Sequence, residues 1–315
     1  MPSLRQYRDR IASVKNTRKI TSAMKMVAAS KLKRAQEQAE AAQPYARAFD
    51  EMIANVSAGL APGARVSPLL SGNGREDRYL LVVMTSDRGL CGGFNANLLR
   101  SVRAEIRRLE SFGKQVKILC VGRKGRDSLK RDHADKIIDT VAATPGKARL
   151  NFTDAQRIST MLLSMFGRDS FDVALLMFNE FKSVLTQKPR AQQIIPFSKN
   201  PLPLQGGGQG GGPANLNPPP SPPLKGGDKR GSPYHYEPSE EEILAELLPR
   251  NVSVQLFRAM LDSAAGEQAA RMTAMDNSTR NAGDMIKRLS ITYNRARQAA
   301  ITKELIEIIS GAEAL

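Results

Sequence analysis

The sequence contains no tryptophan, and only 5% of its 315 residues are aromatic. Large packed α/β enzymes usually hold more aromatic mass than this. A low aromatic content is typical of helical pairs whose interfaces are lined by Ala, Leu, Ile and Met. With 41% hydrophobic residues the chain can still build a core, and its length suits one large domain or two ordinary ones.

Cysteine and histidine are almost as scarce as the aromatic residues. Cys91 and Cys120 do not form a Cys-x-x-Cys pair and provide no disulfide framework, so we expect two reduced thiols. His133 and His235 lie in different segments without partner ligands at metal-binding spacing. We therefore expect neither a metal site nor a cofactor.

Long apolar runs are also missing. No run of eighteen apolar residues occurs, so no segment is predicted to span a membrane. The first residues hold no apolar core of a signal peptide, and a helical pattern begins at Ser3, which leaves no room for a transit peptide. The expectation is a bacterial protein of the cytoplasmic compartment.

Acidic residues are nearly absent from the first 34 positions, where Asp9 stands alone against ten basic residues. A solvated helix face usually mixes both signs at a spacing of four. A stripe of one sign, in a chain with a formal net charge of +16, indicates an acidic partner. Nucleic acid, anionic lipid headgroups and an acidic protein all qualify. The ten residues are Arg5, Arg8, Arg10, Lys15, Arg18, Lys19, Lys25, Lys31, Lys33 and Arg34.

A long helix is predicted at the N-terminus, over residues 1–58. This segment contains no glycine and one interior proline, Pro44. Apolar residues recur at spacings of three and four, which indicates helix pairing. At 1.5 Å per residue the helix spans on the order of 85 Å, so it must protrude from any domain of this size. The expected stripes are Leu4, Tyr7, Ile11 and Val14, then, shifted in phase, Ile20, Met24 and Val27.

A second long helix is predicted from Glu240 to the C-terminus. We expect Pro249 to break or kink it early. Further on, apolar residues again alternate at three and four, as in a coiled-coil seam. That seam consists of Ile286, Leu289, Tyr293, Ala296 and Ala300.

Residues 76–199 between the helices predict an α/β domain. Apolar runs without alternation indicate strands buried on both faces of a sheet. Their alternation with helices predicts a parallel, doubly wound sheet. The expected strands are 79–84, 116–121, 172–178 and a short fourth at 192–196, with helices at 95–112 and 153–167.

Two segments are predicted to lack regular structure. Residues 59–75, rich in Gly, Pro and Ser, are expected to form a loop. Residues 200–233 carry glycine runs and three consecutive prolines, a composition that cannot bury enough apolar surface to offset its ordering entropy, so a disordered linker is expected. The predicted fold class is α/β: a long antiparallel coiled coil of the N- and C-terminal helices, with a Rossmann-like sheet domain beside its base.

Residues 86–95, SDRGLCGGFN, are the segment closest to a chemical motif. A glycine-rich turn before a helix can hold phosphate, but its spacing is neither G-x-G-x-x-G nor that of a P-loop. Cys91 would lie near a helix N-terminus, where thiol pKa values fall, yet no histidine is nearby to act as base. Tight turns that pack against the helical pair are the favoured interpretation, and a nucleotide-binding enzyme with helical arms is an alternative.

Three long sequence blocks together are similar to one known family. They are residues 11–31, IASVKNTRKITSAMKMVAASK; residues 86–95; and residues 267–275, EQAARMTAM, with 293–305, YNRARQAAITKEL. These blocks resemble the γ subunit of F-type ATP synthases, and they cover both ends and the middle of the chain.

This resemblance implies a rotating shaft that is not itself catalytic. Its paired helices would lie on the axis of a hexamer of α and β subunits, with the C-terminal tip reaching furthest, into a hydrophobic sleeve. The sheet domain would lie below, with the ε subunit and the membrane c-ring. Proton-driven rotation of the ring would turn the shaft and drive ATP synthesis at the β sites. The complex would sit peripherally on the cytoplasmic face of the bacterial inner membrane.

The resemblance also implies contact residues. The segment facing the acidic lever loop of β would include Met24 and Lys25. Polar contacts with a β loop higher on the shaft would involve Arg297, Gln298 and Thr302. Residues 234–315 would begin with a base segment, where the c-ring loops would meet Tyr234 and Glu237.

Two features depart from the family or leave another reading open. The linker at 200–233 is longer and richer in Gly and Pro than expected, as an insertion in a surface loop would be. This segment contains no pair of cysteines, so thiol regulation is not expected. The basic charge alone also fits a nucleic-acid-binding coiled coil. Few aromatic residues are available to stack bases, however, and no recognition-helix signature is present, so no nucleic acid partner is predicted.

Overall fold

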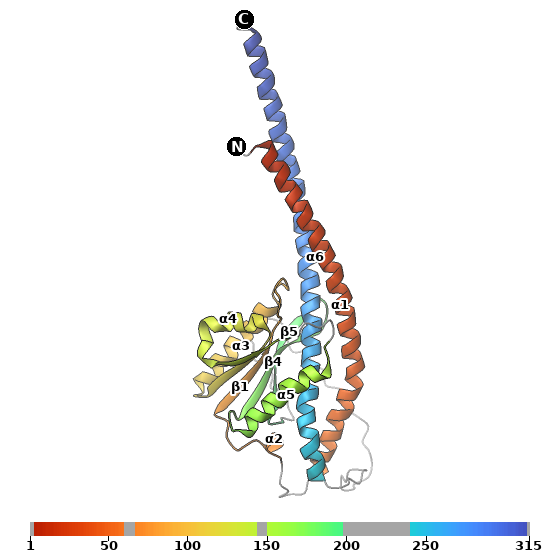
Figure 1. Cartoon of the computed structure of the whole chain (residues 1–315), viewed down its shortest axis with the longest axis vertical. Helices are drawn as coiled ribbons and strands as arrows, with labels where there is room; N and C mark the ends of the chain where they lie inside the picture. The colour runs from red at the N-terminus through yellow and green to blue at the C-terminus, as the bar shows by residue number, and fades with distance from the viewer. Residues whose placement is uncertain (1–2, 60–66, 144–149, 198–239, 314–315) are drawn as a thin grey trace, which may run out of the picture.

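Two long helices run side by side, and a sheet domain packs against one end of the pair (Figure 1). This computed structural model describes residues 3–59, 67–143, 150–197 and 240–313. The helices are α1 (Leu4–Gly59), α2 (Pro68–Ser71), α3 (Phe94–Ser111), α4 (Arg123–His133), α5 (Phe152–Gly167) and α6 (Glu240–Glu313), with a 3-10 turn at Ala134–Lys136. The strands are β1 (Arg78–Met84), β2 (Gln115–Val121), β3 (Ile137–Val141), β4 (Val173–Phe181) and β5 (Gln187–Ile195).

The two terminal helices form the long axis of the molecule. α1 has 56 residues and α6 has 74, which correspond to about 85 Å and about 110 Å. They are antiparallel, and α6 extends past the N-terminal end of α1 (Figure 1). Of the described residues, no helix is apolar enough over a sufficient length to cross a membrane.

Of the break or kink predicted at Pro249, the break does not occur: α6 continues through this residue. A proline inside a helix removes one backbone hydrogen bond. Here Leu248 and Val252 on either side are fully buried in two apolar clusters. Their packing holds the segment helical despite the missing bond.

The sheet has the order β3-β2-β1-β4-β5. β1 pairs in parallel with β2 and β4, and β2 with β3, whereas β4 and β5 are antiparallel. The predicted fourth strand is thus β5, a longer antiparallel edge strand, so the expectation of an all-parallel sheet is wrong at this edge. The hairpin of residues 182–186 is too short for the crossover that a parallel pair requires.

Three elements were absent from the sequence prediction: α2, α4 and β3. α4 is mostly charged and buries only Gly125 and Leu129. β3 lies at an edge, none of its five residues is fully buried, and Asp139 and Thr140 interrupt its apolar residues, so it lacks the apolar run of the central strands. α2 falls inside the predicted loop and is four residues long.

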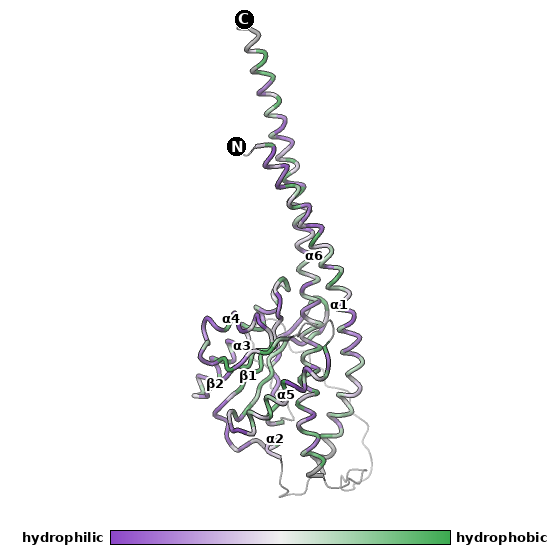
Figure 2. The backbone as a smooth tube through the Cα atoms, in the orientation of Figure 1, coloured by the Kyte–Doolittle hydropathy of each residue, from purple (hydrophilic) through white to green (hydrophobic). Residues whose placement is uncertain are grey.

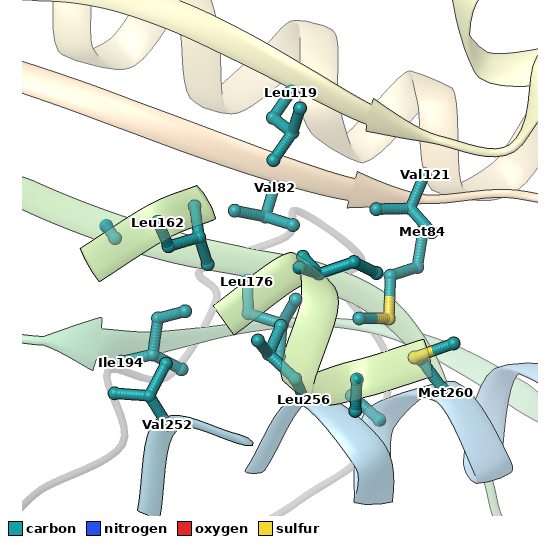
Figure 3. Close-up of a cluster of buried hydrophobic side chains, with 14 of the residues drawn as sticks. Val82, Met84, Leu119, Val121, Leu162, Leu176, Ile194, Val252, Leu256 and Met260 are labelled. Carbon is teal, nitrogen blue, oxygen red and sulfur yellow. The ribbon is translucent and has the colours of Figure 1, made fainter. Parts of the chain in front are cut away.

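The sheet domain has an apolar core on each face. Successive residues of β1 point to opposite faces: Leu80 and Val82 belong to one cluster, Leu81 and Val83 to the other. α3 covers the second face. The first is covered by α5 and α6, and Figure 3 shows Val252, Leu256 and Met260 of α6 beside Leu176 and Ile194 of the sheet.

The lower part of α6 is therefore a layer of the sheet domain as well as half of the helical pair. The strands, such as β1, are largely hydrophobic, while the protruding part of the helix pair mixes hydrophilic and hydrophobic residues (Figure 2). α6 thus connects a conventional core to a thin two-helix rod.

A buried carboxylate closes the end of the sheet away from the helical pair. Asp172 is fully buried and accepts hydrogen bonds from the Arg78 guanidinium at 2.7 Å, from Asn73 at 2.7 Å and from the Arg78 backbone N–H at 2.9 Å. The bond from Arg78 is the main reason that the pKa of Asp172 lies well below its ordinary value. These bonds join the start of β1 to the start of β4.

We predict that Asp172→Asn lowers the free energy of unfolding by about 3 kcal/mol, because it leaves Arg78 and the backbone donors without their charged acceptor. Since the folded-state pKa is depressed, this contribution is full above the unfolded-state value of roughly 3.9 and is lost as pH falls below it. Urea unfolding measures both effects. The exposed neighbour Asp77, paired with Lys114 at 3.0 Å, provides the control Asp77→Asn, expected to cost under about 1 kcal/mol. Equal losses in the two variants would contradict this account.

Candidate partner-binding surfaces of the helical pair

Polar side chains fix the register of α1 against α6. Lys25 Nζ donates to Asp276 Oδ1 at 2.6 Å, the hydroxyls of Thr21 and Thr279 lie 2.8 Å apart, and Arg8 donates to the Tyr293 hydroxyl at 3.0 Å. The Arg8 guanidinium also lies 5.9 Å from the centre of the Tyr293 ring. The two residue numbers in each pair total 300 or 301, so the register stays constant along this part of the pair.

Small side chains fill the seam between the helices. Ala28, Ala265 and Ala269 are nearly or fully buried, and the larger Leu32 packs in one cluster with the last two. The predicted seam residues of α6 are partly buried as expected, as are Leu4, Tyr7, Ile11 and Val14 of α1. A seam of small residues lets the helix axes approach closely.

The second predicted stripe of α1 is wrong, because Ile20 and Val27 point outward. They are 60% and 56% exposed, whereas the neighbouring Thr21 and Ala28 face α6. The phase shift in the sequence therefore marks the point at which the apolar stripe of α1 moves from the side facing α6 to the exposed side. Ile20 and Val27 lie outside the seam, and Met26, Met285 and Ile291 on the two helices are also exposed.

The end of α6 carries a further exposed apolar surface. The register places Leu4, the first residue of α1, opposite residues near Arg297, so α6 continues alone to Glu313 for roughly 24 Å. At least half of the surface of each large apolar residue is exposed there. These residues are Ile301, Leu305, Ile306, Ile308 and Ile309. Contiguous exposed apolar residues mark an interaction surface.

The seven contact residues expected from the resemblance fall into three groups. Met24 and Lys25 are partly buried in the register-setting region, where Lys25 is engaged with Asp276. The part of α6 that continues beyond α1, from about Arg297 to Glu313, is called the overhang. Roughly 30 Å further along α6, Arg297, Gln298 and Thr302 are exposed at the start of the overhang. The Thr302 hydroxyl donates to the Gln298 carbonyl at 2.9 Å. Tyr234 and Glu237 lie outside the described residues.

The glycine-rich turn uses its polar groups internally. The Asn95 side chain accepts from the Ser86 backbone N–H at 3.0 Å and donates to the Ser86 hydroxyl at 2.7 Å. Cys91 is 2% exposed. Gly92, at φ +55°, brings the loop so close to α6 that an added Cβ would lie 3.6 Å from that of Ala274. These contacts favour packing against the shaft over phosphate binding.

Two loops at the same edge of the sheet hold the helix pair, and we call them the collar: residues 85–93 and the hairpin 182–186. Arg271 of α6 donates to the Gly89 carbonyl at 3.3 Å and pairs with Glu267 at 2.6 Å. Val184 in the hairpin packs against the cluster of Leu32, Ala265 and Ala269. Glu267 and Arg271 were not predicted as contacts from the sequence, although their spacing of four indicates an ion pair on one helix face.

Glu267 and Arg271 are both well buried, with 15% and 12% of their side chains exposed. Burial raises the pKa of Glu267, and Arg271 opposes this shift. Removing either residue would leave the other charge buried without a partner, so the pair stabilises the contact between the collar and α6 only while both residues are present.

A long antiparallel helix pair with an α/β domain at its base is also the fold of solved structures that are titled as the central stalk or rotor of ATP synthases. Among solved structures, the chain is similar to one titled the central stalk and c-ring of the Tetrahymena thermophila mitochondrial ATP synthase, with a TM-score of 0.55 and 24% identity over 82% of this chain and 98% of that chain. It is also similar to one titled the rotor of the Euglena gracilis enzyme, with a TM-score of 0.59 and 17% identity over 95% and 98%. At these identities the likeness concerns the fold.

The family itself follows from the sequence comparisons. The family model described as ATP synthase matches residues 3–315. The "ATP synthase gamma chain" of Rhodospirillum rubrum is 54% identical over the whole length of both chains. The chain belongs to the ATP synthase gamma chain family.

We predict that Arg271→Met lowers the free energy of unfolding by about 3 kcal/mol, because Glu267 is left buried without its partner. Since the folded-state pKa of Glu267 is raised, the deficit relative to the wild type shrinks as pH is lowered and the carboxyl takes up its proton. Urea unfolding at several pH values measures this. The double variant Glu267→Gln/Arg271→Met regains part of the loss.

The matched control is Arg280→Met, which breaks the exposed pair with Asp276 at the same spacing of four and should cost under about 1 kcal/mol. A loss in Arg271→Met no larger than in this control would show that the pair contributes little to the collar.

Proposed function

We propose that this chain is the central rotor shaft of an F-type ATP synthase and couples rotation of a proton-driven c-ring to ATP synthesis at the β subunits. The observation that carries this proposal is the continuity of α6. One helix packs on the sheet domain through Val252 and Leu256 and then runs on, paired with α1, to an exposed tip. Torque applied at the domain reaches the tip through unbroken helix and the collar.

The surfaces of the shaft suit a surrounding ring of acidic partners. Basic residues cover the outer side of α1, where nearly all are exposed, and apolar residues such as Ile20 and Val27 lie among them. We infer that the α and β subunits surround the upper shaft and tip. We infer that the sheet domain and base contact the ε subunit and the c-ring.

Three sets of contacts follow for the assembled enzyme. Near the level of Asp276, the acidic lever loop of β would meet Met24 and Lys25. A second β loop, at the start of the overhang, would meet Arg297, Gln298 and Thr302. At the base, the c-ring loops would meet Tyr234 and Glu237.

The strength of these contacts is compatible with turning. Exposed charge pairs contribute between zero and about 1 kcal/mol each, so no single orientation of the shaft is held tightly. The Lys25–Asp276 pair is itself partly exposed, with 45% and 31% of the side chains open to solvent. Lys25 can therefore exchange this internal partner for a passing carboxylate at little cost.

The chain is proposed to be non-catalytic and to act peripherally at the cytoplasmic face of the bacterial inner membrane. Its divisions would be a shaft helix at 1–58, a loop at 59–75, a base domain at 76–199, a linker at 200–233 and a base segment with the second shaft helix at 234–315. In the described segments, no group of three or more His, Cys, Asp and Glu residues could hold a metal ion.

The experiment that tests the function combines assembly with activity. We expect the purified chain to hydrolyse no ATP alone, to co-purify with α and β subunits, and to permit proton-driven ATP synthesis when the complete enzyme is reconstituted in vesicles. ATP hydrolysis by the isolated chain, or full coupling in its absence, would contradict the proposal. Binding to DNA with a steep salt dependence and no binding to α and β would instead favour a nucleic-acid protein.

We predict that joining the two shaft helices covalently leaves the enzyme active. The facing hydroxyls of Thr21 and Thr279 are 2.8 Å apart, so Thr21→Cys/Thr279→Cys can form a disulfide with little backbone movement. Native Cys91 and Cys120 are buried and do not compete. Because both helices turn as one body, the oxidised enzyme should synthesise ATP as fast as the reduced one. Activity that disappears on oxidation and returns with dithiothreitol would mean that the helices move against each other.

A further inference from the structure

A cavity of about 500 Å³ lies between the two shaft helices and the sheet domain, and the rotor function does not use it. It is bounded by α1, α6, the start of α5 and the end of β4. Its volume falls within the roughly 300–1,000 Å³ typical of small-molecule sites. The space has a local cause: apart from Tyr45, α1 presents only alanines to it, at spacings of three and four. These are Ala39, Ala42 and Ala46.

The opposite walls of the cavity are apolar and aromatic. Val254 and Leu261 of α6 form its floor. Phe257 of α6 and Phe152 of α5 meet edge to face, with ring centres 5.6 Å apart and planes at 83°. Tyr45 of α1 lines the same space. Such walls accommodate an aromatic or branched aliphatic group.

Two opposite charges line the cavity one helical turn apart, Arg258 and Asp262. Within the described part of the chain, neither forms a hydrogen bond or an ion pair, although their spacing of four would allow one. Burial raises the pKa of Asp262 to about 6, and Arg258 opposes the shift. Asp262 is therefore largely ionised above that pH, with no bonded partner.

Two of the other charges at this wall, Glu180 and Lys182, are already paired. Glu180 accepts from Lys182 at 2.8 Å and from Arg190 at 3.1 Å. Arg250 lies twelve residues before Asp262, or roughly 18 Å along α6, near the far end of the cavity. Arg258, which is exposed, and Asp262, which is partly buried, thus present one positive and one negative group to the same ligand position.

We propose that this cavity binds a small amphipathic zwitterion of the α-amino-acid type. The ammonium group of the ligand pairs with Asp262, its carboxylate pairs with Arg258, and a large apolar side chain lies between the alanines of α1 and the rings of Phe152 and Phe257. The bound ligand bridges both shaft helices and the sheet domain. Because it binds the folded chain only, it raises the melting temperature by mass action.

The test uses three probes that share one phenyl ring: L-phenylalanine, 2-phenylethylamine, which lacks the carboxylate, and 3-phenylpropionate, which lacks the ammonium group. Titration calorimetry and thermal unfolding of the full chain at pH 8 measure their binding. We expect L-phenylalanine to bind at least about tenfold more tightly than either half, because each half loses one charge-assisted contact.

Two variants assign the contacts. Asp262→Asn should remove the advantage of L-phenylalanine over 3-phenylpropionate, and Arg258→Gln its advantage over 2-phenylethylamine. Ala42→Phe fills the cavity and should abolish binding of all three probes while the chain stays folded. The control Asp127→Asn, at an exposed position on α4, should change nothing.

Three results would overturn the proposal. They are no binding of L-phenylalanine up to about 10 mM, equal binding of all three probes, and undiminished binding in Ala42→Phe. Assembly with α and β subunits is measured separately, so these results leave the rotor function untouched.

Discussion

The structure depends on the burial of one stretch of α6 on the sheet. Val252, Leu256 and Met260 lie in the same apolar cluster as the central strands, so the base of the long helix cannot separate from the domain without opening its core. Everything above that stretch is a two-helix rod with little surface to bury of its own. The collar supports the rod further along α6. There the Glu267–Arg271 pair and the small residues near Ala269 hold the rod. A thin rod can therefore transmit force because its lower end is part of a globular core.

The two-helix rod leaves apolar surface exposed that would stabilise it if it were buried. Thr21, Ala28 and Ala265 occupy the seam, and larger apolar residues point outward or extend beyond α1. For an isolated chain this arrangement exposes apolar area that a stable coiled coil would bury. For a shaft within a ring of partners it provides a smooth surface with individually weak contacts. The partly exposed pair of Lys25 and Asp276 combines both properties, since it sets the register and can yield to another carboxylate.

Much of the architecture could be predicted because its signals are local. Spacings of three and four identify the two long helices, and apolar runs identify β1, β2 and β4, which are buried on both faces. β3 was missed because Asp139 and Thr140 interrupt its short apolar run, and α4 was missed because it is mostly charged. The helix break predicted at Pro249 does not occur because the packing of the neighbouring residues outweighs one lost hydrogen bond. Nothing local reveals that Ile20 points outward or that Arg258 and Asp262 face a cavity, since both depend on how far apart tertiary packing holds α1 and α6.

The most direct test of the central claim attaches a visible probe to the base and watches it turn. Phe112 in the sheet domain is 66% exposed while both native cysteines are buried, so Phe112→Cys offers one reactive thiol. With α and β subunits fixed to a surface and ATP supplied, the account predicts that the probe rotates continuously in one direction. ATP hydrolysis by the assembled complex while the probe keeps a fixed orientation would contradict it.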